Sequence, residues 1–292
     1  MDTDRLSMVS GKVGAGVPTL FLLLTMISTG FAQRLNKSVT AYLQQLPPGA
    51  RVSMEVKSLT DSSIMFEHRA NERVPSASVI KLPIMLEVME RVKAGTLDPD
   101  EIHILTDSEK TGGDGVLKAY PHRSRIAYRD LLRLMMIYSD NTATNIFINE
   151  LGMNAINGRI KAIGLTKPRL NRLMMDTLAA RQGRDNYVTA REMNTLLEKI
   201  YRNQVATPTL CAQMLTILKQ NEDTLTIPRR LPRGTVVAHK TGLLAYIRGD
   251  SGIVYAKVPF LLSVFVEGIP TPEAEQIIAD IALICYTYFS HE

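Results

Sequence analysis

The chain has 292 residues, of which 45% are hydrophobic and 22% are charged. This composition is sufficient for a packed core of one or two domains, and it excludes disordered and collagen-like chains. The net charge is +5 and the basic residues are scattered along helical segments, so the sequence does not favour a nucleic-acid-binding protein.

The first 32 residues differ in character from the rest. Arg5 and Lys12 precede a short apolar run, GVPTLFLLLTMISTGFAQ, in which Gly30 and Ala32 have the spacing of a cleavage site. We expect a secretory signal peptide over residues 1–32, cut after Ala32, and a mature protein that is periplasmic or secreted in a bacterium. An uncleaved membrane anchor is the alternative, but the run is shorter than the roughly 20 apolar residues of a spanning helix. No stable membrane span is therefore expected once the signal is removed.

Helical and strand patterns follow one another along the mature chain. Residues 34–46 have helical spacing, and residues 51–59 and 62–69 alternate as two strands joined by a turn. Six helical segments come next, over residues 80–95, 128–139, 141–152, 153–164, 189–203 and 207–221. Three strands over residues 234–242, 247–257 and 259–268 precede a closing helix over residues 272–289.

Strand patterns thus lie at both ends of the mature chain, with helices between them. We expect an α/β (α+β) fold in which one antiparallel sheet with flanking helices is built from both ends and carries a helical insertion. The expected sheet domain comprises residues 33–74 and 219–292, and the expected all-helical domain comprises residues 75–218.

The two cysteines and five histidines give no sign of a cross-link or a metal site. Cys211 and Cys285 lie far apart, each within an apolar helical segment, so we expect two buried thiols in preference to a disulfide. No histidine has a His, Cys or acidic partner at zinc-like spacing. The sequence therefore predicts no metal ion and no cofactor.

A serine and a lysine stand at the start of the first central helix. In SASVIKLPIML, residues 76–86, Ser78 and Lys81 are three positions apart, so on a helix they lie on one face within hydrogen-bond reach. A serine hydroxyl is a weak nucleophile at neutral pH, and an amine whose charge is disfavoured by apolar surroundings can take its proton. The pair suggests a nucleophile and its base, although Ser-x-x-Lys also occurs on ordinary solvated helix faces.

Two further motifs strengthen that interpretation. YSDNTATN places Ser139, Asp140 and Asn141 between two helical segments, where an Asp or Asn is also suited to cap the second helix. AHKTGLL places Lys240 and Gly242 within a strand, where a glycine indicates close approach by a ligand. The order Ser-x-x-Lys, Ser-Asp-Asn, Lys-Thr-Gly is that of class A β-lactamases and penicillin-binding proteins.

Over essentially the whole mature chain, the sequence resembles the class A serine β-lactamase family. LLRLMMIYSDNTATNIFINELG is similar to the family's helix, catalytic loop and helix, and LPRGTVVAHKTG is similar to its approach to the active-site strand. The resemblance implies four roles near the nucleophile: nucleophile for Ser78, general base for Lys81, proton shuttle for Ser139 and substrate-orienting amide for Asn141. It also implies a substrate-carboxylate site at Lys240, Thr241 and Gly242, and an oxyanion hole formed by the backbone N–H groups of Ser78 and Leu243.

One loop departs from the family pattern. The family carries Arg-Leu-Asp-Arg-x-Glu-Pro-Glu-Leu-Asn, whose first glutamate activates the hydrolytic water, whereas this chain reads KPRLNRLMMDTLAARQGRDNY. If RLNR, residues 169–172, takes the first register, the glutamate position is Met174; if KPRLN is matched to Glu-Pro-Glu-Leu-Asn, it is Lys167. We prefer the first register, because it keeps the usual distance from Ser-Asp-Asn and lets Arg172 pair with Asp185 across the neck of a shortened loop.

Two roles stay open at this stage. In the preferred register the nearest carboxylate is Asp176, which either activates water or caps the turn TLAARQG. Many family members carry an arginine just before the Gly-Ile of the strand after Lys-Thr-Gly, where this chain has Ser251. Arg248, Arg229 and Arg230 are the candidates to supply that positive charge to the substrate carboxylate.

Three functions are compatible with the resemblance. The preferred one is a secreted β-lactam hydrolase with a remodelled deacylation loop. The second is a penicillin-binding or D,D-peptidase-like enzyme that acts on cell-wall peptides. The third is a β-lactam sensor that stays acylated, as loss of the water-activating base would favour, although no signalling domain is visible; an esterase is the remaining alternative. We expect a monomer that acts on a small-molecule substrate.

Overall fold

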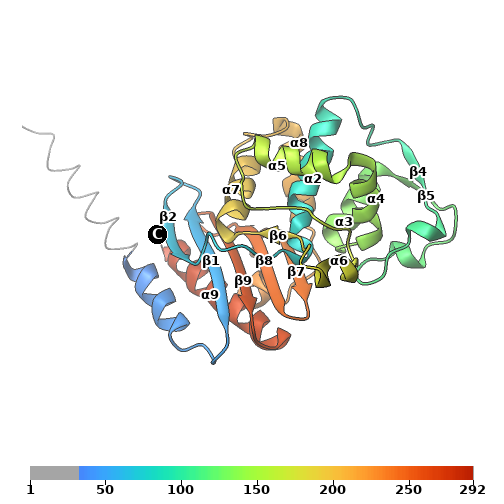
Figure 1. Cartoon of the computed structure of the whole chain (residues 1–292). Coiled ribbons are helices and arrows are strands. Elements are labelled where there is room, and N and C mark those ends of the chain that lie inside the picture. Colours follow the sequence, from blue (N-terminus) through green and yellow to red (C-terminus); the bar gives the residue numbers. More distant parts are fainter. Residues whose placement is uncertain (1–32, 292) are drawn as a thin grey trace, which may run out of the picture.

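The computed structural model describes residues 33–291, so the predicted signal peptide lies outside the described residues. A helix over residues 33–43 begins this part of the chain, and α9 (Thr271–His291) ends it. The two helices lie side by side on one face of a sheet (Figure 1). Among residues 33–291, no helix combines the length and the apolar character needed to cross a bilayer.

The sheet has five strands in the order β2-β1-β9-β8-β7, and all neighbours are antiparallel. The strands are β1 (Arg51–Ser58), β2 (Ile64–His68), β7 (Val237–Leu244), β8 (Ile247–Val254) and β9 (Phe260–Glu267). In register, Val56 pairs with Leu262 and Thr241 pairs with Asp250. Strands from both ends of the chain therefore form one antiparallel sheet, which confirms the predicted fold class.

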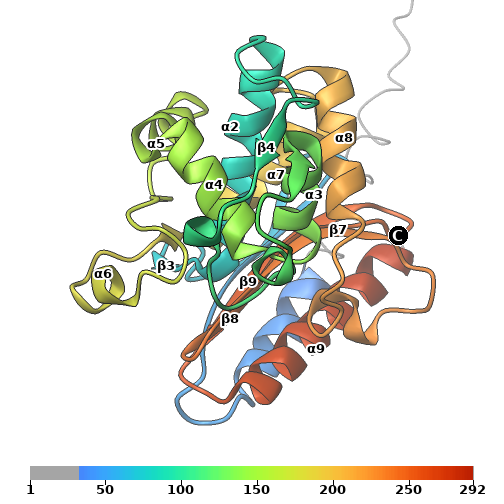
Figure 2. The ribbon, with the colours of Figure 1, turned by 90° about the vertical axis from the view of Figure 1, so that its right-hand side faces the viewer.

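Helices cover both faces of this sheet. On one face Met54 and Val264 pack against α9 and the helix over residues 33–43. On the other face Leu261 and Phe265 belong to a second core, which the central helices complete (Figure 2). Polar side chains within the strands, such as that of Asp250 in β8, are consequently buried and need partners inside the protein.

Six of the seven central helices that the structure describes occur where the periodicity predicted them, and the short α6 (Thr177–Arg181) falls on the turn TLAARQG. They are α2 (Lys81–Lys93), α3 (Tyr128–Ile137), α4 (Asn141–Leu151), α5 (Met153–Ala162), α6 (Thr177–Arg181), α7 (Ala190–Tyr201) and α8 (Pro208–Leu218). Thr189 and Thr207 cap α7 and α8, because each side-chain oxygen accepts a hydrogen bond from the N–H three residues on, at 3.2 Å. The division into domains at residues 33–74 with 219–292 and 75–218 stays a prediction.

Two pairs of very short strands were not predicted. β3 (Val74–Pro75) pairs with β6 (Tyr187–Val188), and β4 (Ile102–Ile104) pairs with β5 (Arg125–Ala127). Strands of two or three residues are too short to show an alternating pattern, so nothing in the sequence distinguishes them from loops.

The two cysteines are buried and free, as predicted. Burial raises the pKa of the Cys285 thiol to about 12. Because the thiolate is the reactive form, this cysteine is chemically inert and serves as a small apolar side chain in the core.

Candidate active site

Ser78 lies in a short 3-10 helix, η1 (Ala77–Ile80), that runs directly into α2. The residue before it, Ala77, has a φ of +45°, a backbone conformation that is strained for a residue with a Cβ atom. Strand β7 lies against this turn at Gly242, where an added Cβ would stand 2.9 Å from the Cβ of Ala77 and 3.1 Å from the amide nitrogen of Ser78. The glycine of Lys-Thr-Gly thus allows close approach by the backbone that carries the serine.

Lys81 is fully buried, and its amine reaches the predicted nucleophile. Its Nζ lies 2.9 Å from Ser78 Oγ, 3.0 Å from Ser139 Oγ and 3.0 Å from Asn141 Oδ1, and it donates to the Ser139 carbonyl at 2.7 Å. Burial and, next, the charge of Lys240 hold the pKa of Lys81 well below its usual value, against the opposing charges of Asp114 and Asp140. An uncharged amine at this distance can accept the proton of Ser78.

Ser139 connects the two lysines. It lies between α3 and α4 with a φ of +54°, and its Oγ is 3.0 Å from Lys81 Nζ and 3.2 Å from Lys240 Nζ. The next residue, Asp140, caps α4 by accepting a hydrogen bond from Ala143 N at 2.9 Å. Asp140 therefore caps the second helix, as the sequence suggested for this motif. The side chains of Ser139 and Asn141 instead contact Lys81.

Lys240 on β7 is also fully buried. Burial lowers its pKa to about 8, although the negative charges of Asp223 and Asp250 act in the opposite direction. Asp250 on β8 in turn contacts Nδ1 of His239 at 3.0 Å and accepts a hydrogen bond from Thr226 Oγ1 at 2.7 Å. Lys240 therefore carries its charge at neutral pH, because the charges of Asp223 and Asp250 partly offset the effect of burial.

A cavity of about 290 Å³ opens beside Ser78. The predicted site residues that line it are Ser78, Ser139, Thr241, Gly242, Leu243 and Arg248. Asn141 touches the amine of Lys81 from α4, as described above. The structure thus brings the three motifs together around one cavity.

Three acidic residues that the sequence analysis did not single out line the same cavity: Asp114, Glu222 and Asp223. Asp114 sits between Gly113 and Gly115, which have φ angles of +76° and +109°. Its carbonyl accepts a hydrogen bond from Asn141 N at 3.1 Å, so this loop is fixed to the Ser-Asp-Asn motif. In the sequence, only the two flanking glycines mark Asp114 as part of a site, since acidic residues in loops are common.

Of the three candidate arginines, all within the described residues, Arg248 lines this cavity. Its guanidinium is buried, donates to Asp223 at 2.7 and 2.9 Å, and donates to Glu275 on α9 at 3.1 Å. Arg229 and Arg230 belong to the 3-10 helix η4 (Ile227–Arg230), where Arg230 pairs with Asp280. Arg248 is positioned to act on a bound anion, but it already has two carboxylate partners.

The loop after α5 closes as the preferred register predicted. Arg172 Nε donates to Asp185 Oδ1 at 2.8 Å, and both side chains are buried. Met174 is held by Asn145 on α4, which accepts from Met174 N at 2.8 Å and donates to Met174 O at 3.2 Å. Because Asn145 lies one helical turn after Asn141, Met174 is fixed beside the helix that touches Lys81.

Asp176 is the N-cap residue of α6, where its Oδ1 accepts a hydrogen bond from Ala179 N at 2.9 Å. The four hydrogen-bond partners of Lys81 Nζ are neutral oxygens of Ser78, Ser139 and Asn141. A role for Asp176 in activating water stays a prediction. Lys167, the position given by the other register, is exposed, and its N–H donates to Glu192 at 2.9 Å.

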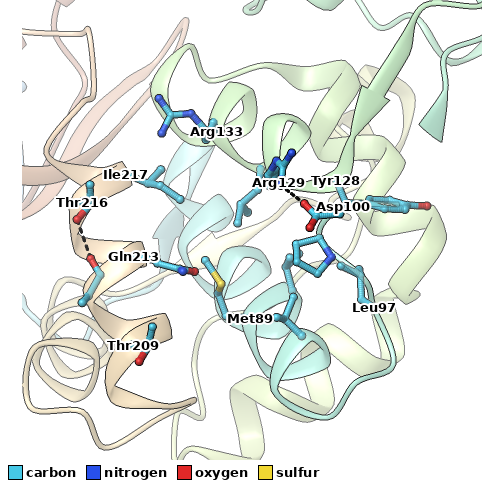
Figure 3. Close-up of a pocket in the computed structure, with 15 residues that line it drawn as sticks. Met89, Leu97, Asp100, Tyr128, Arg129, Arg133, Thr209, Gln213, Thr216 and Ile217 are labelled. Carbon is cyan, nitrogen blue, oxygen red and sulfur yellow. Dashed lines mark hydrogen bonds and ion pairs between the residues drawn. The ribbon is translucent and has the colours of Figure 1, made fainter. Parts of the chain in front are cut away.

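A larger cavity, of about 520 Å³, lies between α2, α3 and α8 (Figure 3). Met89, Leu97 and Ile217 line it, and an ion pair between Arg129 and Asp100 stands at its edge. No residue of the three motifs contributes to its lining. Among residues 33–291, no group of three or more His, Cys, Asp or Glu side chains is arranged to hold a metal ion.

Comparison with known proteins identifies a family independently of the geometry of the site. A family model described as "Beta-lactamase enzyme family" matches residues 31–289. Beta-lactamase VEB-1 and extended-spectrum beta-lactamase PER-1, both of Pseudomonas aeruginosa, are each 28% identical to this chain; each match covers 74% of this chain and, respectively, 78% and 76% of the relative.

Solved structures agree on the fold. PBP-A superposes with a TM-score of 0.80 at 23% identity, covering 90% of this chain and 97% of that one. The TLA-1 extended-spectrum beta-lactamase superposes with a TM-score of 0.82 at 21% identity, covering 89% of this chain and 99% of that one. At such low identity these structures show a shared fold alone.

Proposed function

Since the chain belongs to the beta-lactamase enzyme family, we propose that it opens β-lactam rings through an acyl-enzyme formed on Ser78. The observation that carries this proposal is the buried amine of Lys81, whose pKa is lowered by burial and which lies 2.9 Å from Ser78 Oγ. The proposal places the enzyme in the periplasm or outside the cell, after removal of residues 1–32.

In the acylation step, Ser78 Oγ attacks the lactam carbonyl carbon while its proton passes to Lys81 Nζ. The carbonyl oxygen becomes an oxyanion, which the backbone N–H groups of Ser78 and Leu243 stabilise. The ring C–N bond then breaks, and the leaving nitrogen receives a proton from Ser139 Oγ, which Lys81 replenishes. Ser139 suits this transfer, because its Oγ lies 3.0 Å from Lys81 Nζ.

Substrate binding in this proposal uses the remaining motif residues. Asn141 orients the acyl side chain of the substrate. Lys240, Thr241 and Gly242 on β7 bind the carboxyl group of the substrate. Arg248 on β8 lines the same cavity as Thr241 and Leu243. The charge of Lys240 is retained below a pH of about 8.

The acyl-enzyme is expected to be hydrolysed slowly. In the preferred register Met174 stands where the family has its water-activating glutamate, and the carboxylate of Asp176 caps α6. Methionine cannot accept a proton from water. The same observation favours a second candidate function, a D,D-peptidase-like or β-lactam-binding protein that keeps its acyl group until another acceptor arrives.

Mass spectrometry of the intact mature protein during incubation with benzylpenicillin tests the proposal. The wild-type protein should gain one acyl adduct, and Ser78→Ala should gain none, because the substitution removes the proposed nucleophile, and the other hydroxyl at Lys81 Nζ, that of Ser139, serves as the proton shuttle in this proposal. Ser76→Ala, in the same turn, is the matched control and should label like the wild type. Labelling of the Ser78→Ala protein would refute the mechanism. Decay of the wild-type adduct separates a hydrolase from a binding protein.

A further inference from the structure

The positive charges of Lys240 and Arg248, which form a subsite at the cavity beside Ser78, already face carboxylates of the chain itself. Lys240 and Arg248 supply buried positive charges on neighbouring strands. Both carboxylate oxygens of Asp223 accept hydrogen bonds from Arg248 Nη2, at 2.9 and 2.7 Å. Burial disfavours the charged form of Asp223, but the charge and hydrogen bonds of Arg248, with smaller contributions from Leu225 N and Thr241, outweigh burial and lower the pKa of Asp223, so this carboxylate is ionised.

The loop that follows α8 fixes Asp223 in this position. Asp223 N donates to Asn221 Oδ1 at 2.9 Å, and Leu225 N donates to Asp223 Oδ1 at 3.2 Å. Turns of this kind lock an aspartate side chain to its own backbone. The Asp223 side chain is 29% exposed and lines the cavity, so a substrate bound at Ser78 meets it directly.

The positive charges of the subsite are therefore compensated before any substrate arrives. Arg248 pairs with Glu275 as well as with Asp223. Lys240 faces the charges of Asp223 and Asp250. A substrate carboxylate entering this subsite would find paired cations and a like charge on Asp223, which disfavours binding and selects against such a ligand.

We propose that Asp223 determines specificity by occupying this subsite, so that the enzyme prefers acyl donors whose carboxyl group is capped as an amide over those with a free carboxylate. An amide N–H can donate to an Asp223 oxygen, which has lone pairs beyond those used by Arg248. This inference rests on the proposed acylation of Ser78, and it assigns to that site a neutral, amide-bearing class of substrate.

Acylation rate constants of Ser78 test the proposal, measured by mass spectrometry with benzylpenicillin and with its carboxamide. The wild-type protein should react at least about tenfold faster with the carboxamide, since like-charge contact is costly in a partly buried site. Asp223→Asn should raise the rate with benzylpenicillin at least about tenfold and change the rate with the carboxamide by less than about threefold. Asp223→Ser, which also removes the carboxylate, should shift the ratio in the same direction.

Glu222→Gln is the matched control. It removes the same charge from the adjacent residue in the same cavity, whose side chain hydrogen-bonds with Tyr138. The ratio of the two rates should stay at the wild-type value. An equal shift in Glu222→Gln would mean that only the general charge of the cavity matters, and slower reaction of Asp223→Asn with benzylpenicillin would mean that Asp223 merely orients Arg248. Either result overturns the proposal.

A binding measurement separates this proposal from the proposed function. If neither β-lactam labels Ser78 in any variant, the acylation proposal fails, and the subsite is still testable with N-acetylglycine and N-acetylglycinamide in NMR titrations. Asp223→Asn should then bind the acid at least about tenfold more tightly than the wild type does, with no such gain for the amide. Equal affinities of the two proteins for the acid would refute the role of Asp223.

Discussion

The turn that carries Ser78 and the loop over residues 169–186 meet at α4, and they differ in what their polar groups contact. In the turn, the amine of Lys81 reaches across to two other segments and binds Ser139 and Asn141. In the loop, polar side chains bind other residues of the same loop, as Arg172 does with Asp185 where the two ends of the loop meet. In the preferred register, the side chain at the glutamate position is the apolar Met174.

This difference indicates a division of labour within one site. The turn has strained backbone at Ala77, close contact with Gly242 and a base with a lowered pKa, all of which favour formation of a covalent bond. In the loop, the carboxylate of Asp176 caps α6 and that of Asp185 pairs with Arg172. The following predictions act either on the turn and its neighbour Lys240 on β7 or on the loop.

The largest effect is expected from Lys81→Ala, which removes the base from the turn. Acylation by benzylpenicillin should slow by about 10² to 10⁴-fold, the usual contribution of a positioned general base. Rapid-quench mass spectrometry measures this rate, and circular dichroism confirms that the variant is folded. A rate within about tenfold of the wild type would assign the proton of Ser78 to another group.

Met174→Glu should change the loop without changing the turn. A carboxylate at this position can take a proton from water near the acyl group, so the lifetime of the adduct should fall at least about tenfold while acylation stays the same. The variant should also unfold at a lower temperature, because Met174 is 9% exposed and a buried carboxylate loses its hydration.

The matched control for that variant is Leu178→Glu, which adds the same charge to the same loop at a side chain that is 64% exposed. The adduct lifetime of this control should equal that of the wild type. If Met174→Glu left the lifetime unchanged, or if both variants shortened it equally, the apolar side chain at position 174 would not be the cause of slow hydrolysis.

The pH dependence of acylation reports on Lys81 in the turn and on Lys240 in the neighbouring strand β7. Burial lowers the pKa of Lys240 to about 8, so its charge is present below that pH and is lost as the pH rises through it. We expect acylation to fall by up to about tenfold between pH 8 and pH 9 as this charge is titrated. The lowered pKa of Lys81 acts on the acidic side, where protonation would remove the base.

Lys240→Arg distinguishes this explanation from general alkaline inactivation. Because a guanidinium stays protonated, the fall above about pH 8 should disappear in the variant, even if its rate at neutral pH is lower. A fall at the same pH in wild type and variant would assign the titration to another group.

The smallest effect is expected from Asp176→Asn. Asparagine caps a helix nearly as well as aspartate, so α6 should persist, and the lifetime of the adduct should stay within about twofold of the wild type. Time-resolved mass spectrometry of the benzylpenicillin adduct provides the measurement. A much longer lifetime would instead identify Asp176 as the group that activates water, and the loop would then share in the chemistry.

Local patterns in the sequence predicted a large part of this arrangement. The spacing of Ser78 and Lys81 survives folding because a single helical turn carries both residues. The pairing of Arg172 with Asp185 followed from the register of one loop. In both cases the interacting residues are close in sequence or belong to one motif, so their contact can be predicted from the local sequence.

The acidic part of the site could not be predicted in the same way. Asp223 and Arg248 lie on a loop and a strand that meet only in the folded protein, and Glu275 reaches the same guanidinium from α9. The segment IRGDSGIV was predicted as a strand, but its polar residues gave no sign of complete burial. That burial depends on helices that cover both faces of the sheet.

The place of β1 in the sheet also governs how the chain folds. Val56 pairs with Leu262, so the hairpin of β1 and β2 finds its sheet neighbour only after nearly the whole chain has been synthesised. Contacts between residues so distant in sequence close slowly, and until then β1 has an unpaired edge that other chains can bind. The central helices, which make closer contacts in sequence, can assemble earlier. Completion of the sheet by β9 is therefore expected to be the late step of folding and the stage most exposed to aggregation.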